Sequence, residues 1–405
     1  NMILTNRDFI IGVNWLGLFL DTPNMPLGEW ATMIEGHIKR HAAKGVKVLA
    51  VFLSSPFAAP SKTLPYKVDR YIVKPDTTKD TWKTEFNPVF WSQMLKVFND
   101  FCVTYKIVPV YCLTGYTSQQ VLHPVKRVNK MNGKWIAPAG SLYHPNSLNF
   151  YYRVLTKLIQ VCGKNIMIMP TNEPNVGMWS RNSIHDKQNV LAIARFHNSI
   201  TEKAKALGLA DHNIMINICE GFSRKTGETI ALATGDIMTK MITGKIDENG
   251  NPISNQRTKN KYVIWTDHQI GSLRDMIGNI CPPMTKDEKF SSLLTRTLLR
   301  VAPSPDGYNK DGGGLYSQAL YDCFVEIGNY INKGKLPKGM TGRVAGIFLD
   351  HPRRNENHPA ELVYEVIDGP YNRLSRVVMH LEAIQDERLE LLAKAYKAVY
   401  GHLPY

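Results

Sequence analysis

The feature that most constrains this chain is a regular alternation of short apolar runs with longer helical patterns along almost its whole length. Short apolar runs indicate strands buried on both faces, and the amphipathic stretches between them indicate helices that cover those faces. Such alternation is typical of βα units around a parallel sheet. The apolar runs fall at 9–15, 46–53, 107–112, 165–169, 214–219, 262–265, 298–302 and 344–349.

Helical patterns separate most of these runs. They fall at 29–43, 90–105, 148–161, 189–207, 228–241, 315–331 and 372–400. Eight strands with this alternation favour a closed barrel over an open doubly wound sheet. No GxGxxG or GxxxxGK[ST] pattern follows a strand, so a nucleotide-binding α/β fold lacks its usual support. We therefore expect an α/β fold: a single (β/α)8 TIM barrel over residues 1–405, with long loops at its C-terminal face.

Composition narrows the class of protein further. The chain is 43% hydrophobic and 21% charged, which fits a globular protein and excludes a disordered one. No stretch approaches the roughly 18 apolar residues that a membrane span needs. The net charge of +14 favours polyanionic partners, anionic glycans among them. No nucleic-acid-binding motif accompanies this charge, so we do not expect a nucleic-acid partner.

The cysteines and the first residues bear on the compartment. The cysteines are scattered at spacings that match neither a disulfide framework nor a zinc site, so we expect buried free thiols in a reducing compartment and no metal or other cofactor. The start of the chain, from Asn1 to Leu4, lacks the charged and apolar regions of a signal peptide. We expect a cytoplasmic protein or one released without a leader. The cysteines are Cys102, Cys112, Cys162, Cys219, Cys281 and Cys323.

The most specific motif is Pro-Thr-Asn-Glu-Pro-Asn at 170–175, directly after the fourth apolar run. It places the carboxylate of Glu173 at the C-terminal tip of a strand, on the face where barrel enzymes build their active sites. Hydrolysis of a glycosidic bond needs a carboxylic acid that protonates the leaving oxygen, and a nearby amide such as Asn172 can hold a sugar hydroxyl. A loop turn with a chance Asn-Glu-Pro is the competing interpretation.

Asn-Glu-Pro at the end of a fourth strand resembles the acid/base motif of clan A glycoside hydrolases. Gly-Val-Asn-Trp at 12–15 resembles the opening strand of the family 5 cellulase/mannanase type. The resemblance implies that Glu173 is the general acid/base and Asn172 its substrate-binding neighbour. We also expect Asn14 and Trp15, at the tip of the first strand, to contact substrate.

The chain departs from the clan A pattern at the seventh strand. Clan A enzymes carry a glutamate nucleophile at the tip of that strand, and residues 300–306 contain no glutamate. The second strand lacks the arginine usual near this nucleophile, and the sixth strand lacks the expected tyrosine. Three explanations stay open: the second carboxylate has moved, the seventh strand lies elsewhere, or hydrolysis is lost.

Other carboxylates follow predicted strands and are candidates for the second catalytic group. Asp267 ranks first because Trp265 to His268 combines an apolar strand, a carboxylate and a titratable imidazole that could bind substrate. Glu220, after the fifth strand, could replace it or keep Glu173 protonated, because a nearby like charge raises a carboxyl pKa. Asp350, after the eighth strand, is expected to bind substrate. Each could instead cap a loop or form a salt bridge.

Aromatic side chains near strand tips complete the predicted site, because the apolar faces of sugar rings stack on flat rings. Trp179 and Trp135 are predicted glycan platforms, and Trp135 ends a predicted β-hairpin over 125–135. Trp30 and Trp91 lie in helical patterns and are expected in the core. The sequence thus favours a glycoside hydrolase that cleaves a polysaccharide or oligosaccharide, with a catalytically silent glycan-binding barrel as the alternative.

Overall fold

The centre of the computed structural model is an eight-stranded sheet in the order β8-β5-β2-β1-β12-β11-β10-β9, and every pair in it is parallel. The strands are β1 (Ile10–Asn14), β2 (Val48–Phe52), β5 (Val108–Thr114), β8 (Met167–Thr171), β9 (Met215–Cys219), β10 (Tyr262–Asp267), β11 (Arg296–Val301) and β12 (Val344–Leu349). The structure describes residues 10–14, 26–53, 73–75, 84–86, 90–114, 130–131, 134–135, 145–171, 187–210, 213–219, 262–267, 296–301, 321, 324–325, 328–329, 344–349, 386 and 388–405.

All eight predicted strands are present, with three shifted boundaries that matter for the site. β10 runs to Asp267, beyond the predicted end at 265, so Asp267 belongs to the strand and does not follow it. β11 begins at Arg296, ahead of the predicted start at 298. β8 runs to Thr171, so Pro170 and Thr171 belong to the strand and not to the loop that the sequence predicted. The pairing of Thr114 with Thr171 carries the β5–β8 ladder past Met169, which explains the extension.

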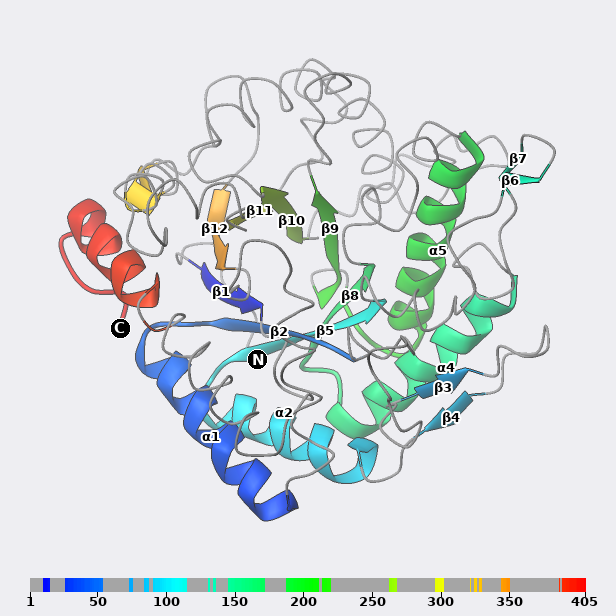
Figure 1. The fold of residues 1–405 in the computed structure, drawn as a ribbon, viewed down its shortest axis with the longest axis horizontal. Helices are drawn as coiled ribbons and strands as arrows, with labels where there is room; N and C mark the ends of the chain where they lie inside the picture. The colour runs from blue at the N-terminus through cyan, green and yellow to red at the C-terminus, as the bar shows by residue number, and fades with distance from the viewer. Residues whose placement is uncertain are drawn as a thin grey trace.

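Helices lie on the outer side of the strands (Figure 1). They are α1 (Leu27–Ala43), the π-helical η3 (Phe90–Met94), α2 (Leu95–Thr104), α4 (Pro145–Cys162) and α5 (Lys187–Ala206). The four predicted helices in this half of the chain are therefore confirmed. The predicted helix at 228–241 lies outside the described residues. Helical residues at 321, 324–325 and 328–329, and at 386 and 388–400, fall within the last two predicted helices.

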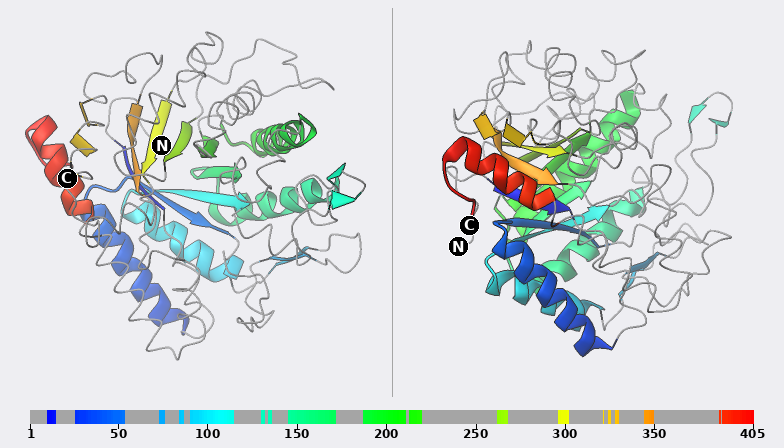
Figure 2. Two further views of the ribbon diagram at one scale, coloured as in Figure 1. Left: turned by 45° about the horizontal axis from the view of Figure 1, so that its top comes forward. Right: turned by 60° about the vertical axis from the view of Figure 1, so that its left-hand side comes forward.

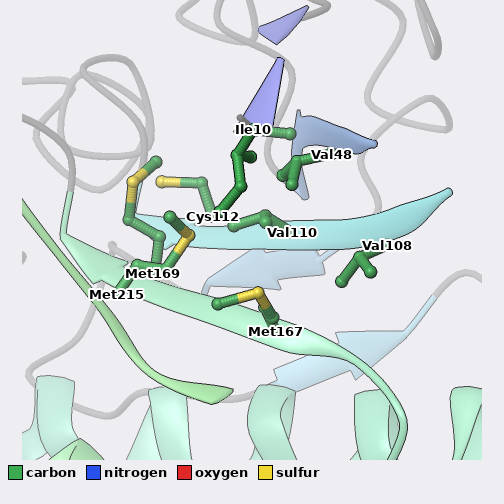
Figure 3. Packing of buried hydrophobic residues seen from close by; sticks show 9 residues of the cluster. Ile10, Val48, Val108, Val110, Cys112, Met167, Met169 and Met215 are labelled. Atoms are coloured by element: carbon green, nitrogen blue, oxygen red, sulfur yellow. The ribbon is translucent and has the colours of Figure 1, made fainter. Parts of the chain in front are cut away.

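The described side chains of β1, β2, β5 and β8 are buried on both faces of the sheet. Partners in a parallel ladder project to the same side and successive residues alternate, so the register sorts the strand residues into two sets. One set contains a buried apolar cluster, drawn in Figure 3. Its members are Ile10, Val48, Ala50, Val108, Val110, Cys112, Met167, Met169 and Met215. We call the positions in register with it the cluster set.

The alternate positions form the helix-facing set. Tyr111 belongs to it and meets Phe98 of α2 edge-to-face, with ring centroids 6.1 Å apart. Trp30 of α1 and Trp91 of η3 are fully buried, which confirms that both are core residues. Continuous apolar runs, rather than alternating ones, follow from this burial on two sides.

The two terminal strands of the sheet order, β8 and β9, lie next to each other. One parallel bridge joins Ile168 to Ile214. Just before β9, the Asn213 side-chain amide donates to the carbonyl oxygens of Ile166, at 2.8 Å, and Lys164, at 3.2 Å. These bonds tie the entry of β9 to the entry of β8.

A buried polar chain joins β5 to two helices. The Tyr111 hydroxyl donates to Asn99 Oδ1 of α2 at 3.0 Å, and Asn99 Nδ2 donates to the Cys162 carbonyl at the end of α4 at 3.3 Å. Burial raises the pKa of Tyr111 well above its ordinary value and raises the pKa of Cys162 to about 12. Cys102, Cys112 and Cys162 are free thiols, as expected.

The C-terminal helical segment, residues 388–400, packs beside α1 (Figures 1 and 2). Arg40 Nε lies 3.1 Å from Asp386 Oδ2, and Lys44 Nζ lies 3.2 Å from Glu390 Oε1. Partly exposed ion pairs such as these stabilise weakly, by about 0–1 kcal/mol each. They nevertheless define which end of α1 the segment meets.

Two short antiparallel hairpins lie outside the eight-stranded sheet. β6 (Lys130–Met131) pairs with β7 (Lys134–Trp135), which confirms the strands of the predicted hairpin. β3 (Val73–Pro75) pairs with β4 (Thr84–Phe86), a hairpin that the sequence did not predict. In the part of the chain that the structure describes, no helix is both long and apolar enough to cross a membrane.

The buried polar chain predicts a measurable cost for Tyr111→Phe. Removing this hydroxyl leaves Asn99 Oδ1 buried without its donor, so the free energy of unfolding should fall by about 1–3 kcal/mol in urea titration. Tyr105→Phe is the matched control: the Tyr105 hydroxyl donates to Glu35 Oε1 at 2.8 Å at the protein surface, and its loss should matter much less. Equal losses in the two variants would contradict the role assigned to the buried chain.

Candidate active site

The carboxyl ends of the eight strands meet at one edge of the sheet, because every strand runs in the same direction. In parallel α/β proteins this edge is where ligands bind. The residues that end the strands in the structure are Asn14, Phe52, Thr114, Thr171, Cys219, Asp267, Val301 and Leu349.

The Asn-Glu-Pro motif follows β8 directly. Thr171 is the last residue of this strand and pairs with Thr114 of β5. Asn172 and Glu173 are the next residues in the chain and lie outside the described part. β8 is the fourth strand of the sheet in chain order, as the sequence predicted.

Two further predicted site residues end strands of the sheet. Asn14 is the last residue of β1 and Asp267 is the last residue of β10. Four other candidates come directly after the last residue of a strand and lie outside the described residues: Trp15 after β1, Glu220 after β9, His268 after β10 and Asp350 after β12. Trp179, farther along the chain from β8, also lies outside the described residues.

The strand register divides the residues at this edge. Thr266 of β10 pairs with Cys219 of β9 and with Arg300 of β11, and Arg300 pairs with Phe348 of β12. These ladders continue through Gly12 and Val48 to the buried apolar cluster, so all of these positions belong to the cluster set.

Asp267 belongs to the other set. It pairs with Val301, which pairs with Leu349, and Leu349 pairs with Val13. Leu349 and Val13 are buried in positions alternate to the cluster. Asp267 therefore occupies a helix-facing position in the ladder, although it ends its strand at the predicted edge.

Arg300 is a position that the sequence analysis did not select. It lies one residue before the end of the seventh strand, in the cluster set. The sequence shows an alternation of Arg296, Leu298 and Arg300 along that run. Apolar residues occur in both alternating sets of this strand, so the face to which Arg300 belongs follows only from its pairing partners.

Trp135 lies in β7, and the β6–β7 hairpin stands apart from the eight-stranded sheet in Figures 1 and 2. The hairpin is therefore peripheral to the edge where the other candidates follow their strands.

No model of a known protein family matches the chain, and no curated protein matches its sequence. A search of solved structures finds distant similarities. A glycoside hydrolase family 5 mannosidase from Rhizomucor miehei is 13% identical, with a TM-score of 0.46 over 96% of this chain and 94% of the mannosidase. A structure of the GH20 modules of a pneumococcal exo-β-D-N-acetylglucosaminidase is 10% identical, with a TM-score of 0.47 over 96% and 85%. A family 1 β-glucosidase from Thermotoga maritima is 10% identical, with a TM-score of 0.43 over 86% and 89%. All three are glycoside hydrolases, and each is distant in sequence from this chain.

Proposed function

We propose that this chain is a glycoside hydrolase on a closed (β/α)8 barrel, with Glu173 as its general acid/base. The observation that carries the proposal is the position of Asn-Glu-Pro, which begins one residue after the end of the fourth parallel strand. A glutamate at this place in a barrel follows a strand whose backbone is fixed on both sides. Such support holds a catalytic carboxylate in a defined position.

Closure of the sheet is supported at its two ends. The bridge between Ile168 and Ile214 and the bonds from Asn213 bring β9 to β8, which is the contact that turns an eight-strand sheet into a barrel. The buried apolar cluster supports the same proposal, since the inward residues of a barrel pack against one another across its axis.

The proposed chemistry uses Glu173 in its protonated form. Its carboxylic acid donates a proton to the glycosidic oxygen as the bond to the anomeric carbon breaks. A second carboxylate then either attacks the anomeric carbon or activates a water molecule. Asn172 is proposed to bind a sugar hydroxyl beside the reacting carbon, with Asn14, Trp15 and His268 as further substrate contacts from neighbouring strand ends.

For the second carboxylate, the register supports Asp350. Gly346 and Phe348 belong to the cluster set, and Asp350 comes two residues after Phe348 in the sequence. Asp267, which the sequence analysis preferred, ends β10 in the helix-facing set. Glu220 follows Cys219 and is therefore also alternate to the cluster set in sequence. We propose Asp350 and keep Asp267 as the competing candidate.

A specific observation keeps a second function in view, that of a catalytically silent glycan-binding barrel. β11, from Arg296 to Val301, contains no carboxylate, although the seventh strand carries the nucleophile in clan A enzymes. If no other carboxylate replaces it, the site can bind sugar without cleaving it.

Glu173→Gln should leave the melting temperature unchanged and lower hydrolysis by about 10²–10⁴-fold, because the amide keeps the shape of the side chain and cannot donate the proton. The measurement is the rate of new reducing ends from a panel of polysaccharides. Retained activity would exclude Glu173 as the acid. Absence of cleavage by the unmodified protein, with sugar binding intact, would favour the silent barrel.

Asp350→Asn and Asp267→Asn separate the two candidates for the second carboxylate. We expect Asp350→Asn to abolish turnover and Asp267→Asn to retain most of it, with correct folding checked by circular dichroism. The reverse result would restore Asp267. Glu220→Gln completes the set: if Glu220 raises the pKa of Glu173, this variant should shift the basic limb of the pH–rate profile to lower pH while leaving the maximum rate similar.

Trp179→Ala and Trp135→Ala test the proposed glycan platforms. Trp179 follows the same strand as Glu173, so its loss should weaken binding of an oligosaccharide more than it lowers the melting temperature. Trp135 lies in the peripheral hairpin and should affect oligosaccharide affinity less. Isothermal titration calorimetry with a hexasaccharide measures both, and an unchanged affinity in Trp179→Ala would reduce Trp179 to a packing residue.

A further inference from the structure

We propose that the amino edge of the sheet, opposite the edge of the proposed site, is a docking surface for an anionic membrane. Three exposed lysines, Lys47, Lys106 and Lys164, form this surface together with the exposed side chains of Leu403 and Tyr405. We call the three lysines the amino-edge lysines. The occupant is a bilayer that carries acidic lipid headgroups. The proposal goes beyond the proposed function and does not depend on it.

The amino-edge lysines precede three neighbouring strands of the sheet. Lys47 comes just before β2, Lys106 just before β5 and Lys164 just before β8, and these strands are adjacent in the sheet order β8-β5-β2. The backbone of Lys47 is held on both sides: its N–H donates to the Ile11 carbonyl and its carbonyl accepts from the Val108 N–H, both at 2.8 Å. Neighbouring strands lie about 4.8 Å apart, so the three strand starts span about 10 Å along this edge.

Lys106 adopts a left-handed backbone conformation where two similar turns have glycine. Its φ is 58°, the one positive φ of a non-glycine residue in the described part of the chain. Its N–H donates to the Val103 carbonyl at 3.2 Å, and the next N–H donates to the Cys102 carbonyl at 2.8 Å. Gly45 after α1 and Gly208 after α5 make the same pair of bonds, with φ of 83° and 96°.

This pair of bonds is the Schellman motif, whose left-handed residue is usually glycine because a Cβ disfavours the conformation. Glycine would therefore suit the backbone after α2 better than Lys106 does. An unfavourable backbone conformation at an exposed, charged residue points to a use for its side chain.

The charge of the amino-edge lysines is not neutralised by nearby carboxylates. Among the described residues, none of the three forms an ion pair, whereas Lys44 pairs with Glu390 and Lys96 pairs with Asp100. Glu35 lies close to this edge, where its Oε1 accepts from the Tyr105 hydroxyl at 2.8 Å, but it forms no ion pair with the neighbouring lysine. The edge therefore presents unpaired positive charge in a chain whose net charge is +14.

Exposed apolar side chains lie beside these lysines. The Pro404 carbonyl oxygen is 3.0 Å from the position that a Cβ would take on Gly45, so this proline packs against the turn that precedes β2. Its two neighbours in the chain, Leu403 and Tyr405, are 38% and 64% exposed.

A bilayer surface takes up both kinds of side chain. Acidic headgroups attract lysine, and the interface below them accepts apolar and aromatic groups. A soluble polyanion would use the lysines alone. The combination of lysines with exposed Leu403 and Tyr405 therefore favours a membrane over a soluble anionic polymer.

The competing explanation for the lysines is local. Each of them follows the C-terminal end of a helix, α1, α2 or α4, where a cation interacts favourably with the helix dipole. In that case their loss would lower the melting temperature and leave binding to vesicles unchanged. Lys106→Gly separates the two explanations, because glycine relieves the backbone and removes the charge.

The experiment measures co-sedimentation of the full chain with two kinds of vesicle. One contains equal parts of phosphatidylglycerol and phosphatidylcholine, and the other contains phosphatidylcholine alone. Heparin fragments, titrated by calorimetry, are the probe for a soluble polyanion. The melting temperature of every variant is recorded, and each vesicle measurement is repeated at higher salt.

Two triple variants remove the same number of positive charges. The amino-edge variant combines Lys47→Gln, Lys106→Gly and Lys164→Gln. The control combines Lys96→Gln, Arg153→Gln and Lys394→Gln, which are exposed residues on helices away from the strand starts. Lys106→Gly and Leu403→Ser are also made singly.

We expect the unmodified chain to bind the acidic vesicles and not those of phosphatidylcholine alone. The amino-edge variant should lose about tenfold or more of this affinity, and the control variant much less. Lys106→Gly should weaken binding while its melting temperature stays the same or rises. Leu403→Ser should weaken binding to vesicles, most visibly at higher salt, and leave heparin binding unchanged.

Four outcomes would overturn the inference. They are no binding to acidic vesicles, an equal loss in the two triple variants, full vesicle binding by Lys106→Gly, and heparin binding that depends on the amino-edge lysines while Leu403→Ser binds vesicles normally. The last result would identify a soluble polyanion as the partner. Because no step of the experiment uses turnover, failure of the proposed hydrolase leaves each of these results readable.

Discussion

The hydrogen-bonded register of the parallel sheet is the constraint on which the rest of this structure depends. Each strand must satisfy its backbone groups from both neighbours, and the terminal strands of an open sheet cannot do so. The bridge at Ile168 and the Asn213 amide bring β9 and β8 together at the point where the sheet order ends. The same register fixes which residues share a face. It therefore determines both the apolar cluster and the polar positions above it.

The register also determines which residue types lie together near the carboxyl edge, where the site is proposed. Most residues of the cluster set are apolar, and Asn217 is a polar member in the middle of the sheet. Towards the carboxyl edge the set holds polar residues from several strands: Asn14, Thr114, Thr171, Thr266 and Arg300. The Asn-Glu-Pro motif follows one of these positions directly. In the proposed function, the glutamate that follows this strand acts on a ligand bound at the carboxyl edge.

Sequence patterns predicted the existence and order of all eight strands, because runs buried on two faces are continuously apolar and separated by amphipathic helices. Because these runs are continuously apolar, the sequence does not show which of their residues share a face of the sheet. In an alternating strand, polarity reveals which residues share the buried face. In β11, Arg296, Leu298 and Arg300 share one set and Thr297, Leu299 and Val301 share the other, so both sets mix polar and apolar residues. Asp267 and Arg300 could therefore be separated only by their pairing partners. The sequence also predicted too early an end for β8, because proline has no N–H to donate to a strand ladder and Pro170 therefore indicated a loop. In the structure the ladder from β5 continues to Thr171.

The most direct measurement of the central claim is a crystal structure of Glu173→Gln with a bound oligosaccharide. We expect a sugar ring to lie at the carboxyl edge of the sheet, with the residue 173 amide in contact with a glycosidic oxygen. A second carboxylate should then lie about 5–5.5 Å from residue 173 for a retaining enzyme, or about 6.5–9.5 Å for an inverting one. A sugar bound elsewhere, or no carboxylate within about 10 Å of residue 173, would contradict the assignment of a hydrolytic site to this edge.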